Sequence, residues 1–84
     1  MLSELADGKK VTGLKQTRRA VLDGSAVRVY IAEDAEMRLR RELIDICRAH
    51  DVPYVDITSM EELGQACGIE VGAAVAAILY EITA

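Results

Sequence analysis

The chain has 84 residues, a formal net charge of −4 and no Trp or Phe, so its core must be built from aliphatic side chains and tyrosine. A chain of this length forms a single domain, residues 1–84, and its ordinary charged fraction excludes wholesale disorder. No apolar run reaches the ~20 residues of a membrane span. The first residues do not form a secretory signal, so we expect a cytoplasmic protein.

The charges are distributed unevenly along the chain. Residues 1–28 carry six basic and three acidic side chains, whereas residues 51–84 carry six acidic and no basic ones. We therefore expect a local basic surface on an otherwise acidic protein. Such a protein would bind nucleic acid through a specific geometry and not through broad neutralisation of phosphates.

No catalytic or metal-binding pattern stands out. His50 is the single histidine, and Cys47 and Cys67 have no neighbouring ligands, so a four-ligand zinc site cannot be assembled. We expect two reduced and mostly buried thiols, no metal, no cofactor and no enzymatic activity. A third hypothesis is an enzyme acting on a small phosphorylated metabolite, and turnover that is lost specifically on changing Cys67 or His50 would support it.

Helical and extended patterns alternate along the chain. Apolar residues three or four positions apart indicate helices, and alternating β-branched residues indicate strands. The expected elements, in chain order, are a short helix over residues 2–7, a strand at 10–12, a helix at 14–23, a strand at 27–31, a helix at 35–50, a strand at 52–57, a helix between Ser59 and Gly68, and a strand at 73–79.

Three helix ends carry specific signals. Gly24 occupies the position just after the helix at 14–23. Asp34 is the expected N-cap of the helix at 35–50. Ser59 and Glu62 form a capping box, in which the serine hydroxyl accepts a bond from a helical N–H and the glutamate reaches back.

The last predicted strand, 73–79, is apolar on both faces and contains four alanines among its first five residues. It should therefore lie at the centre of a sheet that is covered on both sides. Together with the alternation of helices and strands, this predicts an α/β fold, a three-layer α/β/α sandwich with a small mixed four-stranded sheet. Because the layers can close within one chain, we expect a monomer.

Near the start, a glycine opens a helix that carries basic and amide side chains, in the segment Gly13-Leu14-Lys15-Gln16-Thr17-Arg18-Arg19. The helix N-terminus offers free N–H groups and partial positive charge to a phosphate. Lys and Arg can donate to guanine O6 and N7, and Gln can bridge a base edge. The alternative interpretation is an ordinary amphipathic helix with a solvated basic face.

Near the end, glycines bound a short loop within Leu63-Gly64-Gln65-Ala66-Cys67-Gly68-Ile69-Glu70-Val71-Gly72. A loop between a helix and a central strand lies at the sheet edge, where ligands bind in α/β folds. Exposed aliphatic side chains there could pack against extruded bases. The alternative interpretation is that Ile69 and Val71 belong to the core.

Two further segments lie between these two, Tyr30-Ile31-Ala32-Glu33-Asp34 and Val52-Pro53-Tyr54-Val55. Together the four segments resemble the kink-turn RNA-binding ribosomal proteins of the L7Ae and L30e type. The resemblance spans about residue 9 to residue 80. It implies a protein that grips the kink-turn, a sharp RNA bend built on tandem sheared G·A pairs beside a bulge.

The resemblance also implies a role for each matching residue. Gly13 lets the backbone approach the RNA, Lys15 and Gln16 read guanine edges, Thr17 belongs to the same motif, and Arg19 supplies positive charge. Residues Ile69, Glu70 and Val71 cover the bulged nucleotides. The chain departs from archaeal and eukaryotic members, which carry Asn-Glu where Lys15-Gln16 stands here.

The sequence thus favours a non-catalytic RNA-binding protein whose partner is a structured RNA with a kink-turn, of ribosomal or riboswitch type. The ribosome is a further possible partner, and we expect neither DNA nor a membrane. The second hypothesis is a protein-interaction module of a ribonucleoprotein or ribosomal complex. Its contact surface would be the acidic C-terminal half.

Overall fold

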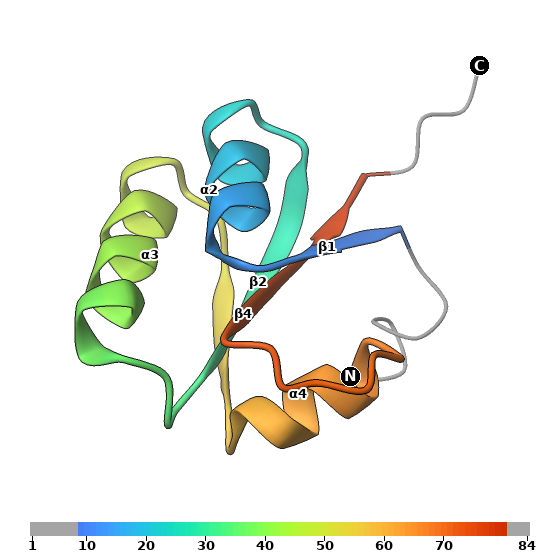
Figure 1. Ribbon diagram of the computed structural model, residues 1–84. Coiled ribbons are helices and arrows are strands. Elements are labelled where there is room, and N and C mark those ends of the chain that lie inside the picture. Colours follow the sequence, from blue (N-terminus) through green and yellow to red (C-terminus); the bar gives the residue numbers. More distant parts are fainter. Residues whose placement is uncertain (1–8, 81–84) are drawn as a thin grey trace.

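The computed structural model describes residues 9–80, which form three helices and a four-stranded sheet (Figure 1). The predicted helix at residues 2–7 lies outside the described residues. None of the described helices is long and apolar enough to cross a membrane. In chain order the elements are β1 (Lys10–Thr12), α2 (Leu14–Leu22), β2 (Ala26–Ala32), α3 (Met37–Ala49), β3 (Tyr54–Ile57), α4 (Met60–Ala66) and β4 (Val75–Leu79).

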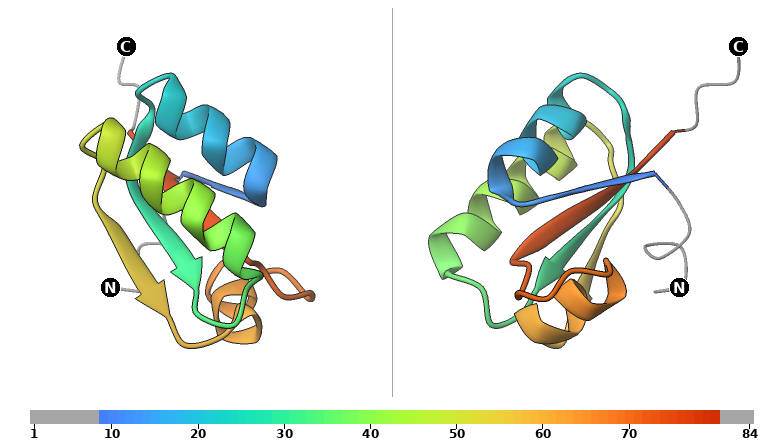
Figure 2. Two further views of the ribbon diagram at one scale, coloured as in Figure 1. Left: turned by 90° about the vertical axis from the view of Figure 1, so that its left-hand side faces the viewer. Right: turned by 45° about the vertical axis from the view of Figure 1, so that its right-hand side comes forward.

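The sheet is mixed, and its strand order is β1-β4-β2-β3. Strand β4 runs antiparallel to both of its neighbours, β1 and β2, whereas β2 runs parallel to β3. Strands β1 and β2 therefore point the same way. Helix α2 follows β1 and helix α3 follows β2, and these two helices also run in the same direction as each other (Figure 2). The predicted central position of the last strand is confirmed.

Helices cover both faces of the sheet, which confirms the predicted three-layer sandwich. Helices α2 and α3 pack on one face and α4 packs on the other (Figure 1). Successive residues of β4 divide between the two cores: Val75 and Ala77 pack under α2 and α3, and Ala76 packs under α4. Because both sides of this strand are buried, its sequence shows no polar positions.

The helix ends agree with the predictions at two positions. Gly24 follows α2 with φ 81°, in the left-handed region that favours glycine. The hydroxyl of Ser59 accepts a hydrogen bond of 3.1 Å from the N–H of Glu62.

The prediction for Asp34 was wrong. Helix α3 begins at Met37, and its N-cap is Glu36, which makes no side-chain cap bond. The chain turns through residues 33–36 after β2, and this turn carries the Asp34 carboxylate to the start of another helix. Its Oδ1 accepts a bond of 2.8 Å from the N–H of Met60, the first residue of α4.

Both cysteines are free and buried, on opposite faces of the sheet. Since the sheet separates them, they cannot form a disulfide with each other. Burial raises the pKa of the Cys47 thiol to about 11. Burial also raises the pKa of Cys67, where the positive charge of Lys10 partly opposes the effect.

The folded protein should therefore resist thiol alkylation at neutral pH. A raised pKa means that less thiolate is present at every pH below it, and the thiolate is the reactive form. Iodoacetamide labelling followed by mass spectrometry should be slow on the native protein and fast in denaturant. Fast labelling of Cys47 in the native protein would contradict its burial.

Candidate nucleic-acid interface

The two segments singled out in the sequence meet at one end of the sheet. The N–H of Gly13 donates a hydrogen bond of 3.0 Å to the carbonyl of Val75, the first residue of β4. Residues 67–74, here called the α4–β4 loop, lead directly into Val75. The left view of Figure 2 shows the N-terminus of α2, the start of α3 and the orange-red loop on the same side of the molecule.

Gly13 provides the backbone conformation that joins β1 to α2. Its φ of 91° and ψ of 157° are rarely adopted by residues with a side chain. No atom lies within 4 Å of the place where a Cβ would stand. A glycine at this position therefore adopts the backbone conformation that the turn requires, and it leaves the space in front of the helix N-terminus open.

Three of the predicted contact residues are exposed on α2, namely Lys15, Gln16 and Arg19. The first turn of this helix contains no acidic residue. Lys15 and Gln16 therefore place positive charge and amide donors where the helix dipole is also positive, whereas Arg19 lies in the last turn. At the far end of α2 the pKa of Asp23 is lowered, chiefly by hydrogen bonds from the hydroxyl and amide of Ser25, with a smaller contribution from Arg19.

Thr17, the fourth predicted RNA-binding residue of α2, differs from these three. Its side chain is fully buried on the inner side of α2, and its Oγ1 has no partner among the described residues. Its N–H donates to the carbonyl of Gly13 at 3.0 Å within the helix. Thr17 therefore packs beneath the exposed side chains and offers no group to a ligand.

Arg18 points toward the neighbouring helix. Its Nε donates a hydrogen bond of 2.7 Å to the carboxylate of Glu42 on α3, and its Nη2 contacts the same oxygen. This ion pair links α2 to α3, so Arg18 supports the position of the helix that carries Lys15 and Gln16.

The α4–β4 loop presents its aliphatic side chains to solvent. Ile69 is 36% exposed and Val71 is 71% exposed, and Glu70 between them is also exposed. These values exclude the interpretation that Ile69 and Val71 belong to the core. An apolar surface of this kind, placed beside a basic helix start, can cover a base that has left its stack.

Helix α4 holds the loop in place. The carbonyl of Gly64 accepts a bond of 3.1 Å from the N–H of Ile69, and the carbonyl of Met60 accepts one of 2.9 Å from the N–H of Ala73. A Cβ at Gly64 would stand 2.2 Å from the carbonyl oxygen of Val71. The loop backbone therefore lies directly on the helix, at a distance that only glycine permits.

The turn after β2 completes this arrangement. Ala32 donates from its N–H to the carbonyl of Ala74 at 2.8 Å, and Glu33 donates to Ile57 at 2.7 Å. With the Asp34 bond to α4, the turn is connected to both ends of the segment that carries Ile69 and Val71. This supporting role of Gly64 and Asp34 was not predicted from the sequence. One signal for Gly64 was available, because a glycine inside a helix disfavours it and so indicates a close contact.

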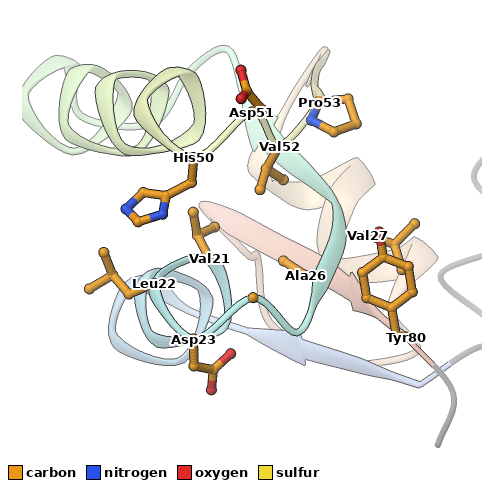
Figure 3. A pocket seen from close by; sticks show the side chains of 11 residues that line it. Val21, Leu22, Asp23, Ala26, Val27, His50, Asp51, Val52, Pro53 and Tyr80 are labelled. Atoms are coloured by element: carbon orange, nitrogen blue, oxygen red, sulfur yellow. The ribbon is translucent and has the colours of Figure 1, made fainter.

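A surface hollow of about 330 Å³ lies elsewhere, between the C-terminal ends of α2 and α3 (Figure 3). Leu22 and His50 lie on one side of it in that view, and Tyr80 lies on the other. None of the predicted contact residues lines this hollow.

Within residues 9–80 no group of three or more His, Cys, Asp or Glu side chains is placed to hold a metal ion. His50 is exposed at the end of α3, whereas Cys67 is buried in the core under α4. The two side chains suggested for an enzyme therefore do not form a pair.

Fold and site together define a small α/β/α sandwich whose basic helix start and apolar loop form one surface. The chain matches the ribosomal protein L7Ae/L30e/S12e/Gadd45 family over residues 3–82, and it belongs to this family.

Among curated proteins, the chain is 43% identical over 76 residues to the RNA-binding protein TTE2299 of Caldanaerobacter subterraneus, covering 90% of this chain and 93% of that protein. It is 44% identical over 75 residues to the RNA-binding protein YbxF of Geobacillus stearothermophilus, covering 89% and 92%.

Two solved structures have the same fold. The 15.5-kDa RNA-binding protein of Giardia lamblia superposes with a TM-score of 0.85 at 31% identity, covering 95% of this chain and 68% of that one. A Bacillus halodurans protein of unknown function superposes with a TM-score of 0.86 at 25% identity, covering 94% and 83%.

Substituting Gly64→Ala should destabilise the protein and displace the α4–β4 loop. Alanine normally stabilises a helix interior by about 1 kcal/mol over glycine, but here its Cβ would collide with the Val71 carbonyl. Thermal unfolding and amide chemical shifts of residues 69–73 measure the two effects. Gln65→Ala, on an exposed position of the same helix, is the control. A more stable Gly64→Ala protein with unchanged loop shifts would contradict the close approach of the loop to α4.

Substituting Asp34→Ala should lower the free energy of unfolding by about 1 kcal/mol, the usual value of a side-chain bond to a helix N-terminal N–H. The destabilisation arises because the Met60 N–H is left without its acceptor. Chemical denaturation measures the change. Asp45→Ala, an exposed carboxylate on α3, is the control, and equal effects of the two substitutions would refute the cap.

Proposed function

We propose that this protein binds RNA and that its target is a kink-turn. The observation that carries the proposal is the juxtaposition of two unlike surfaces. The start of α2 exposes Lys15 and Gln16, and the adjoining α4–β4 loop exposes Ile69 and Val71. A bent RNA with extruded bases presents polar base edges and bare base faces together, and this surface matches both.

The polar half of the surface suits guanine edges. The Lys15 ammonium can donate to O6 and N7, and the Gln16 amide can donate to one base atom while accepting from another. Arg19, one turn further along α2, is placed to meet a phosphate. The open space at Gly13 lets the sugar–phosphate backbone approach the helix N-terminus, whose N–H groups favour an anion.

The apolar half suits nucleotides that have left the helix. Ile69 and Val71 can pack against the faces of bulged bases, and the Glu70 carboxylate between them can accept from a base amino group or a ribose 2′-hydroxyl. Because the loop is held on α4 by backbone bonds and by its close approach to Gly64, little ordering is needed on binding.

The comparisons support RNA as the ligand. Two curated relatives that match almost their full length are named RNA-binding proteins, and so is a solved structure with the same fold. The kink-turn is supported by the family and by the residues at the start of α2 and in the α4–β4 loop. The buried, unpaired thiols suit a reducing compartment, so we also propose that the protein is cytoplasmic.

The protein would act by shifting a population of RNA conformations. A kink-turn RNA exchanges between extended and bent forms, and a rigid surface that fits only the bent form stabilises it by its differential affinity. No chemical step is involved.

The test is a titration of a kink-turn RNA labelled at both ends, followed by fluorescence transfer. The expected result is tight binding together with a shortened end-to-end distance. The control RNA has Watson–Crick pairs in place of the tandem sheared G·A pairs. Equal and weak binding to both RNAs would refute the proposal and favour the protein-interaction module.

Substituting Lys15→Ala should weaken binding to the kink-turn by about 5- to 150-fold, because removing a base-edge contact costs ~1–3 kcal/mol. The same substitution should change binding to the control RNA far less. The matched control is Arg48→Ala, which removes an exposed positive charge from the last turn of α3. An unchanged dissociation constant for Lys15→Ala would show that Lys15 does not read the RNA.

A further inference from the structure

We propose that the RNA interface continues from α2 onto the N-terminal half of α3, where Arg38 and Arg41 bind the phosphate backbone of one helical stem next to the bend. This inference rests on the proposed function and deepens it. It adds two arginines that neither the sequence analysis nor the family match assigned to the site.

The register of the two helices places these arginines beside Lys15. Helices α2 and α3 lie side by side and run in the same direction (Figure 2). The Arg18–Glu42 ion pair sets their register. One turn before Arg18 on α2 is Lys15, and one turn before Glu42 on α3 is Arg38, so these two side chains lie at the same level.

Arg38 and Arg41 are three residues apart and therefore share one face of α3. Both are exposed. Packed helix axes are about 8–10 Å apart, so an RNA stem in contact with Lys15 reaches this face of α3 without crossing another element. The three side chains form one continuous basic surface.

Two nearby arginines, one on α2 and one on α3, have structural partners. Arg18 is bound to Glu42, and Arg40 is bound to Asp56 on β3 at 2.8 Å. Among the described residues no carboxylate lies within ion-pair distance of Arg38 or Arg41. Two arginines thus fix α3 to its neighbours, while two others project from its outer face with their donors uncommitted.

The charges around this face favour a phosphate ligand and set its path. An exposed guanidinium offers a fork of donors that matches phosphate oxygens. Glu33 and Glu36 are exposed in the turn before α3 and would repel a phosphate placed at the end of the helix. Asp45 is also exposed, one turn after Arg41 on α3. The backbone of the stem should therefore cross the outer face at Arg38 and Arg41, between the turn before α3 and Asp45.

The experiment measures the salt dependence of binding to the kink-turn RNA with two long stems. The variant carries Arg38→Gln and Arg41→Gln, and glutamine keeps the helix propensity of arginine. The control variant is Arg48→Gln, on the same helix as Arg41 but about two turns closer to its C-terminus. Thermal unfolding of each protein establishes that the fold is intact.

The measured quantity is the slope of the logarithm of the dissociation constant against the logarithm of the salt concentration. We expect this slope to be smaller by about two in the double variant, about one for each phosphate that the variant no longer neutralises. The slope of the Arg48→Gln protein should match the wild type. Shortening one of the two stems should weaken wild-type binding and leave the double variant unaffected.

Two outcomes would overturn the inference, and they are distinguishable from failure of the proposed function. An unchanged salt slope in the double variant, with wild-type protein still selecting the kink-turn over its control RNA, would refute the α3 contact alone. Equal decreases of the slope in the double variant and in Arg48→Gln would show a general charge effect. Failure of the wild-type protein to select the kink-turn would refute both proposals.

Discussion

The hydrogen bond from the Gly13 N–H to the Val75 carbonyl joins the two halves of the candidate interface. It ties the residue that opens α2 to the first residue of β4, and each of these residues adjoins one of the surfaces proposed to contact RNA. The φ of 91° at Gly13 turns the chain from β1 into α2 while keeping this bond. Neither surface alone would distinguish a bent RNA from other ligands, so their adjacency is the basis of the proposed specificity.

The loop side depends on backbone contacts that leave no room for adjustment. The Val71 carbonyl lies against Gly64, and the carbonyls of Met60 and Gly64 receive N–H groups of the loop. Asp34 in turn supports the start of α4 from the turn after β2. These contacts fix the loop backbone, although the side chains of Ile69 and Val71 are exposed and add little packing of their own. A preformed loop binds with a smaller loss of conformational entropy.

Much of this structure could be predicted from the sequence. The doubly apolar pattern at the end of the chain predicted a central strand covered on both sides, and Ser59 and Gly24 marked helix ends correctly, because these signals are local. The role of Asp34 was missed because its partner, the Met60 N–H, lies 26 positions further along the chain. Whether Ile69 and Val71 were core or surface was also undecided, since their exposure depends on how closely Val71 approaches Gly64.

The candidate site residues, too, could be predicted only in part from the sequence. Lys15, Gln16 and Arg19 were expected on a polar helix face and are exposed there. Thr17 belongs to the same motif, yet its side chain faces the core, because successive residues of a helix point about 100° apart. A sequence motif alone does not distinguish the residues that contact a ligand from those that hold the helix in place.

The most direct test of the central claim is to map the RNA-contacting amides by NMR during titration with a kink-turn RNA. We expect the shifts to concentrate at residues 13–16 and 69–72 together, with the residues around the hollow at His50 unperturbed. Shifts confined to one segment, or centred on that hollow, would contradict the claim that the start of α2 and the α4–β4 loop act as one surface.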